Sequence, residues 1–374
     1  MSLQMRKLLR LFAAVLGWQL FLALPSSATV DKARCFASIE AVMRFEDEAP
    51  CLELAHNRKT SATDRAKILF QVGLAVQEHW QEHKKPFESA WQDAYAYWAD
   101  AIAADPAYVE PYLAIAVRAG FDDKQKTIDL LDKGLAALPD NPRLKAFKAA
   151  VMMYYGPPEQ MGKLCDEAVK ADPMSPDVAS ACGDVYDSLG RHVEALASFQ
   201  NSAETFDPLK RRRYGMLGES NPFQDMAQIY SKLGDDATAA KTLEAFAAKF
   251  ETAMTPDIKA ELAGYQERTG DYKSAVENYR SAFEHPSAAN QRTLVVPYVF
   301  ALAHAGEVDK ALEVSEYFAK QPELKIILML QVRLKNTVAP HLKINGKYDS
   351  ATREAMKDCI VSEECEAGFE SIRL

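Results

Sequence analysis

The sequence predicts an all-α fold built from stacked helix pairs. Among its 374 residues, the stretch from Ser175 to Pro208 places small and large side chains at the spacing of two antiparallel helices. Gly183 and Ala195 stand where two helix backbones approach closely, while Tyr186 and Phe199 fill the space between them. Similar stretches recur along the chain, and no alternation of apolar and polar residues indicates strands. Because one helix pair cannot bury its apolar face alone, the pairs are expected to stack into an α-solenoid.

The N-terminal residues are typical of a secretory signal. Arg6, Lys7 and Arg10 precede an apolar run over residues 11–24, and small residues follow it. This order predicts a cleaved signal peptide over residues 1–28 and a periplasmic protein with no transmembrane anchor after cleavage. The alternative is an uncleaved anchor, although the run is shorter than the ~20 residues that usually span a bilayer.

The charge balance argues against some classes of partner. The chain carries 44 basic and 53 acidic residues, which gives a formal net charge of −9. An acidic protein is repelled by nucleic-acid phosphates and by anionic membrane surfaces. We therefore expect no nucleic-acid partner.

Six cysteines in an exported protein favour disulfide bonds. The candidate pairs are Cys165 with Cys182, Cys359 with Cys365, and Cys35 with Cys51. The first pair lies at nearly equal distances on either side of an Asp-Pro turn, so antiparallel helices would place it face to face. The second pair flanks a short loop. The third pair is close in sequence, but the helical pattern does not place its members opposite each other. Buried free thiols are the alternative.

The chain is expected to begin, after the signal, with a helical cap and then weak repeats. Residues 31–62 predict two short helices that break at Glu48–Pro50. A long helix from about Thr63 and a partner over 88–104 follow, separated by an insertion. Two weaker repeats are expected over residues 108–141 and 142–174.

Stronger repeats follow the weak ones. The stretch from Ser175 to Pro208 comes first, and then three units marked by Gly234, Gly270 and Gly306, which lie 36 residues apart. Taken together, the positions of glycines, aromatic residues and alanines resemble the tetratricopeptide repeat. The resemblance implies about six or seven repeats over residues 63–322, with a concave surface that holds a protein or peptide.

The resemblance also identifies the side chains that would face the concave groove. In the family, four offsets of each first helix face it. Here these positions are Asp177, Ser180, Asp184 and Asp187 in the first strong repeat, Asn221, Gln224, Gln228 and Ser231 in the next, and Asp257 and Glu267 in the third. The carboxylate-clamping members of the family carry Lys, Arg and Asn there, whereas this chain carries acids and amides. A polar or basic peptide ligand is therefore expected.

The C-terminal segment, residues 323–374, has a different pattern. Leu330, Gln331 and Leu334 are followed by an Asn-Gly turn at 345–346, an aromatic residue and a helix that starts near Thr352. This order resembles the peptidoglycan-binding-like domain of bacterial envelope proteins, with the third helix replaced by a cysteine-bearing tail. The expected core residues are Leu330, Leu334, Ile344, Tyr348 and Met356. The alternative is a degenerate helix pair that caps the solenoid.

If this second resemblance holds, it implies affinity for the cell wall through one loop. The candidate contacts are His341, Lys343, Asn345, Lys347 and Tyr348. Lysine can pair with the carboxylates of stem peptides, and tyrosine can stack on a sugar ring.

No catalytic site, cofactor or metal site is predicted. His79, Glu82 and His83 match the H-x-x-E-H pattern of one class of zinc peptidase, but they lie at a helix end beside an exposed insertion. The basic run over 210–213 could dock an acidic partner, although such runs are usually solvated. We predict a non-enzymatic scaffold that is tethered to the cell wall. A pure protein adaptor is the first alternative, and a zinc-dependent hydrolase is a remote one.

Overall fold

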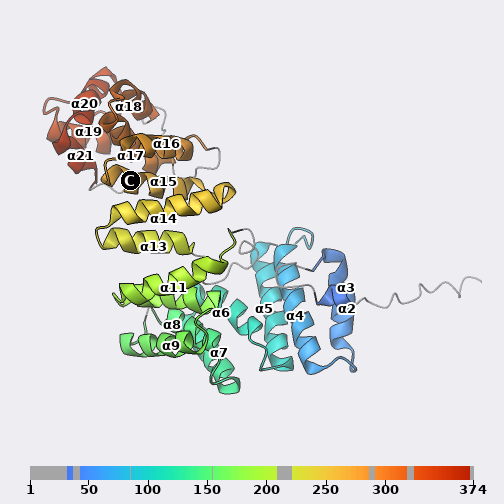
Figure 1. Cartoon of the computed structure of the whole chain (residues 1–374). Helices are drawn as coiled ribbons and strands as arrows, with labels where there is room; N and C mark the ends of the chain where they lie inside the picture. The colour runs from blue at the N-terminus through green and yellow to red at the C-terminus, as the bar shows by residue number, and fades with distance from the viewer. Residues whose placement is uncertain are drawn as a thin grey trace, which may run out of the picture. The chain divides into compact units, whose positions relative to one another are not determined.

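The chain folds into helices arranged in two compact units. The computed structural model describes residues 32–36, 43–84, 86–153, 155–208, 221–285, 291–317 and 324–370. Within these ranges every regular element is a helix and none is a strand (Figure 1). The boundary between the units follows Tyr155, inside the repeat expected over 142–174. The predicted all-α class of stacked helix pairs is confirmed.

The first unit contains the expected cap and the first helix pairs. In chain order its helices are α2 (Lys32–Cys35), α3 (Phe45–His56), α4 (Ala62–Glu78), α5 (Phe87–Ala104), α6 (Glu110–Asp122), α7 (Lys124–Ala137) and α8 (Pro142–Met152). The helices α4 and α5 pack at Gly73, where an added Cβ would lie 2.4 Å from Nε1 of Trp98. That indole nitrogen donates a hydrogen bond to the carbonyl of Phe70 at 3.2 Å. The glycine therefore allows the large tryptophan ring to be buried between the two helices.

The helix break expected at Glu48–Pro50 is wrong. Helix α3 continues through Pro50 to His56. Proline removes one backbone donor from the helix, but the next residue, Cys51, is buried and forms a disulfide with Cys35 in α2. This tertiary anchoring holds the segment helical where local propensity favours a break.

The second unit contains the strong repeats and the C-terminal segment. In chain order its elements are α9 (Pro158–Ala171), α10 (Pro176–Ser188), α11 (His192–Thr205), α13 (Pro222–Lys232), α14 (Asp236–Lys249), the short 3₁₀ helix η1 (Glu251–Ala253), α15 (Pro256–Arg268), α16 (Tyr272–Phe283), α17 (Gln291–His304), α18 (Val308–Ser315), α19 (Leu324–Thr337), α20 (Ser350–Ile360) and α21 (Glu363–Glu370). Each second helix packs against the next first helix, so that α11 contacts α13, α14 contacts α15 and α16 contacts α17. This succession of helix pairs is the predicted solenoid (Figure 1).

One glycine turn recurs between the first and second helices of these pairs. Gly190, Gly234, Gly270 and Gly306 all have φ between +72° and +83°, a region that favours glycine. After Gly190, the backbone N–H of Arg191 donates to the carbonyl of Tyr186 at 2.8 Å, as in a Schellman motif. The same bond joins Asp235 to Tyr230, Asp271 to Gln266, and Glu307 to Leu302. The repeated turn gives successive pairs the same local geometry.

The three predicted disulfides are present. Cys165 and Cys182 join α9 to α10, as the antiparallel arrangement predicts. Cys359 and Cys365 close the short loop between α20 and α21. All six cysteines are therefore paired.

The C-terminal helices share one hydrophobic core with the preceding helix pairs. Met356 of α20 and Phe369 of α21 belong to the same buried cluster as Val299 and Phe300 of α17. The expected core residues Leu330, Leu334 and Met356 are buried, but Ile344 is exposed. The next residue, Asn345, donates its backbone N–H to the side chain of Gln331. The cysteine-bearing tail also forms a helix, α21.

No helix within the described ranges is both long and apolar enough to cross a bilayer. The signal peptide expected over residues 1–28 and the basic run over 210–213 lie outside the described residues.

Candidate functional site

Asp184, near the middle of α10, is a carboxyl group without a partner among the described residues. Its side chain is half-buried. Burial, together with the nearby charge of Asp187, raises the pKa of the Asp184 carboxyl to about 6. A carboxylate that loses hydration without gaining a hydrogen bond is poised to bind a cation.

Asp187 lies one turn further along α10 and has two partners. His192 approaches one of its oxygens through Nδ1 at 3.1 Å. The ammonium of Lys232, at the end of α13, donates to the other oxygen at 2.5 Å. Asp187 therefore links two neighbouring repeats, and Asp184 beside it is the carboxylate that remains available.

The candidate residues of α13 have different roles. Gln224 donates from Nε2 to Oε2 of Glu261 in α15 at 2.8 Å. Asn221 accepts from the backbone N–H of Phe223 at 3.1 Å and caps the helix. Gln228 is exposed. Among these three residues, Gln228 is the one whose polar group is open to a ligand.

The remaining groove candidates differ in exposure. Ser180 is 1% exposed, so its hydroxyl faces the packed interior. Asp177 is half-buried in the first turn of α10, and Asp257 is exposed in the first turn of α15. Ser231 donates to Asp236 at 2.6 Å and is occupied in that contact.

Glu267, at the end of α15, has the second strongly shifted carboxyl. Burial raises the pKa of Glu267 to about 7, against the opposing effect of a hydrogen bond from the Tyr279 hydroxyl at 3.0 Å. The charge of Glu366 in α21 raises it as well, and His304 pairs with that carboxylate at 2.9 Å. Unlike Asp184, Glu267 therefore accepts a hydrogen bond from within the protein, from the Tyr279 hydroxyl.

Sequence reasoning missed two residues of this surface, Lys232 and Glu261. Both contact candidate residues from a neighbouring repeat. Glu261 lies four residues after Asp257, which is one helical turn, so the helical period could have indicated it. No sequence pattern indicated Lys232, because its contact with Asp187 depends on how α13 packs near α10.

The C-terminal loop is shaped by the buried side chain of Gln331 in α19. Its Oε1 accepts from the backbone N–H groups of Asn345 at 2.9 Å and Gly346 at 2.8 Å. Its Nε2 donates to the carbonyl of Lys347 and to Oγ1 of Thr352, both at 2.9 Å. Gly346 has φ of +71°. One amide side chain thus fixes the whole Asn-Gly turn.

The loop residues predicted to contact the cell wall divide into two groups. His341, Lys343 and Lys347 are exposed. Asn345 directs its amide into the turn, where it donates to Asp349 at 2.9 Å. Tyr348 is half-buried, and its hydroxyl lies 2.8 Å from Oγ of Ser315. Stacking on a sugar would require the tyrosine ring to leave this contact, so Tyr348 is less available to a ligand than the exposed side chains of His341, Lys343 and Lys347.

The two histidines of the H-x-x-E-H pattern bind a different glutamate. Nδ1 of His79 lies 2.9 Å from Oε1 of Glu48, and Nε2 of His83 lies 2.8 Å from Oε2. Glu82 is exposed. No group of three metal-ligating side chains suited to a metal ion occurs among the described residues. The pair of histidines thus joins the end of α4 to α3.

Comparison with known proteins adds similarity of fold alone. No protein-family model and no curated protein matches the sequence. Among solved structures, PilW, a widely conserved type IV pilus biogenesis factor, is 16% identical over 62% of this chain and 98% of its own, with a TM-score of 0.48. Pseudomonas aeruginosa pilF is 16% identical over 56% and 92%, with a TM-score of 0.44. A tetratricopeptide repeat protein from Parabacteroides merdae is 11% identical over 69% and 90%, with a TM-score of 0.43. At these values the similarities carry no argument about what this chain binds.

Proposed function

We propose that this protein is an exported, non-enzymatic scaffold whose first helices in the second unit bind a basic or polar peptide segment of a partner protein. The observation that supports the proposal most strongly is the half-buried Asp184 carboxyl, whose pKa is raised and which has no partner among the described residues. A lysine or arginine side chain of the ligand would supply the missing charge. Gln228, exposed in the next repeat, would contribute an amide to the peptide backbone.

Export agrees with the cysteine chemistry. Three disulfides persist in oxidising compartments such as the bacterial periplasm and are rare in the cytosol. The basic and apolar pattern of residues 1–28 supplies the signal in this proposal.

Charge removal at Asp184 tests the groove. An acetylated peptide of alternating lysine and serine is titrated into the full mature chain, and binding is followed by calorimetry. Asp184→Asn is expected to weaken binding at least about tenfold, because a charge-assisted contact is lost. Affinity for the wild type is expected to fall as the pH drops below about 6, where Asp184 becomes protonated, whereas the variant should lack this step.

The matched control for this test is Glu204→Gln, which removes one exposed carboxylate of α11. It changes the net charge equally and should leave the affinity unchanged. Equal binding by the wild type and Asp184→Asn would exclude Asp184 from the ligand site.

The C-terminal loop carries a second proposal, attachment to peptidoglycan. It is supported by the exposed side chains of His341, Lys343 and Lys347, the last of which lies on the turn that Gln331 holds. The positive charges of Lys343 and Lys347 suit the carboxylates of stem peptides. The alternative, a pure protein adaptor, needs no affinity of this loop for the wall.

Co-sedimentation with purified peptidoglycan separates these alternatives. The double variant Lys343→Glu/Lys347→Glu is expected to lose most of the pelleted fraction, because the loop would then repel the stem peptides. Lys241→Glu/Lys357→Glu, which reverses two exposed charges outside the loop, should pellet like the wild type. If neither the wild type nor the control pellets, the adaptor alternative holds.

A further inference from the structure

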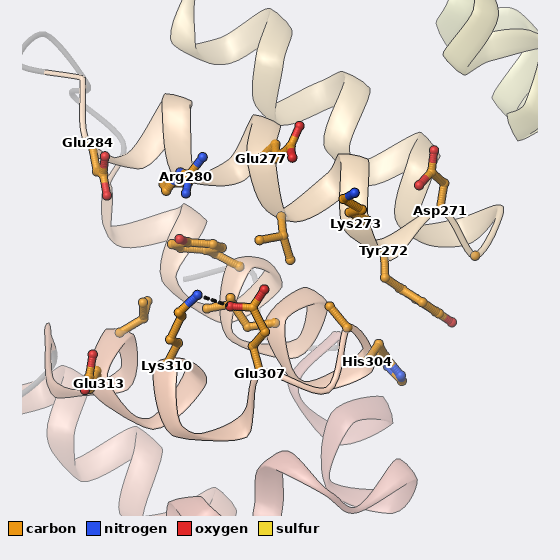
Figure 2. A pocket seen from close by; sticks show the side chains of 16 residues that line it. Asp271, Tyr272, Lys273, Glu277, Arg280, Glu284, His304, Glu307, Lys310 and Glu313 are labelled. Atoms are coloured by element: carbon orange, nitrogen blue, oxygen red, sulfur yellow. Dashed lines mark ion pairs between the residues drawn. The ribbon is translucent and has the colours of Figure 1, made fainter.

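The second unit contains a pocket that the groove does not use. A cavity of about 700 Å³ lies between α16 and α18, with residues of α17 between them (Figure 2). These walls are the second helices of adjacent pairs. The groove candidates, in contrast, lie on the first helices α10, α13 and α15. The pocket is therefore a separate candidate site.

The floor of the pocket is apolar except for one hydroxyl group. Val276 and Leu302 are buried there, and Tyr298 is only 6% exposed. The Tyr298 hydroxyl has no hydrogen-bond partner among the described residues, although it lies close enough to Glu284, Arg280 and Glu307 for their charges to influence its pKa. Burial raises the pKa of Tyr298, so the hydroxyl stays neutral and can accept a hydrogen bond. Tyr298 therefore presents a hydroxyl without a partner to an open pocket, which indicates a place for a polar ligand atom.

The rim of the pocket is charged, with a negative excess. It carries five carboxylates and three cationic side chains, Lys273, Arg280 and Lys310. Lys310 is already paired with Glu307 (Figure 2). Glu277 follows Lys273 by one helical turn, and Glu284 follows Arg280 by one turn just past the end of α16, so each of these cations has a carboxylate one turn away. Glu313, on the opposite wall, has no ion-pair partner among the described residues.

We propose that this pocket binds a lysine or arginine side chain of a protein partner, at a site distinct from the groove. The aliphatic part of such a side chain would lie on Val276, Tyr298 and Leu302, and its charged head would reach the rim carboxylates. The Tyr298 hydroxyl would accept one hydrogen bond from that head. A free anion would be repelled by the net negative charge of the rim. A purely apolar side chain would leave the Tyr298 hydroxyl without a hydrogen-bond partner.

Tyrosine NMR on the full mature chain gives a readout that belongs to this pocket alone. The protein is labelled with ¹³C-tyrosine, and the Tyr298 signal is assigned by its loss in Tyr298→Phe. The probe is the acetylated, amidated dipeptide Lys-Lys, and norleucine-norleucine and Glu-Glu dipeptides serve as neutral and acidic comparisons. Lys-Lys is expected to shift the Tyr298 signal in a saturable manner, and the other two dipeptides should not.

Variants then test the carboxylates. Glu284→Gln/Glu313→Gln is expected to weaken the titration of the Tyr298 signal by about tenfold. The control Glu204→Gln/Glu251→Gln removes two exposed carboxylates outside the pocket and should not change it. Asp184→Asn should also leave it unchanged, so failure of this site and failure of the groove are distinguishable. An unmoved Tyr298 signal, equal shifts with all three dipeptides, or an unaffected Gln double variant would overturn the proposal.

Discussion

Phe199→Ala is expected to destabilise the second unit by about 3–5 kcal/mol, the range for removing a fully buried aromatic ring. Phe199 is 1% exposed, and its ring fills the space that Gly183 leaves in α10. An added Cβ on that glycine would lie 2.6 Å from Cε1 of the ring. Denaturation in urea, followed by circular dichroism on the full mature chain, measures the change. Val193→Ala on the same helix, where the side chain is 79% exposed, should cost less than about 0.5 kcal/mol.

The reciprocal variant makes this prediction more specific. Gly183→Ala alone should also destabilise the unit, because its methyl group meets the Phe199 ring. In the double variant that methyl group enters the space left by the ring. The loss of stability in the double variant should therefore be smaller than the sum of the losses in the two single variants. Additive losses would show that the ring and the glycine are not packed against each other.

Loss of the disulfide between Cys165 and Cys182 is the second large effect. Its members are 17 residues apart, and releasing a loop of that size is expected to cost about 3 kcal/mol in the chain-entropy account. Cys165→Ala/Cys182→Ala should therefore lower the urea midpoint of the second unit. The matched variant Cys359→Ala/Cys365→Ala opens a separation of only 6 residues and should cost less, about 2 kcal/mol. An unchanged midpoint in the first variant would mean that packing alone holds α9 against α10.

The sequence predicted those features that depend on contacts between helices that follow each other along the chain. The turns between helices were marked by Gly190, Gly234, Gly270 and Gly306. A position between two helices with a left-handed backbone conformation favours glycine. The pairing of Cys165 with Cys182 followed from antiparallel geometry in the same way. Such contacts join neighbouring stretches of chain, and the spacing of residues therefore determines them.

Features that depend on how separate parts of the chain pack against each other could not be predicted. Pro50 indicated a break locally, but a disulfide and burial hold the helix there. The family offsets identified both Asp184 and Asp187 as groove candidates. They could not show that Lys232 of the next repeat would bind Asp187 and leave only Asp184 available to a ligand. Tyr348 was expected to face a ligand, although Ser315 of the preceding pair takes its hydroxyl. For Asp187 and Tyr348 the residue that decides the outcome lies 45 and 33 positions away in the sequence.

The shared hydrophobic core of the C-terminal helices limits how the protein can be rearranged by recombination. Phe369 lies against Phe300 with ring centroids 5.9 Å apart, and Met356 belongs to the same cluster. A segment cut before α19 would leave the apolar side of α17 facing water. The segment is therefore not an interchangeable cassette: a chimaera that transfers it to another protein should carry α17 and α18 with it in order to stay soluble.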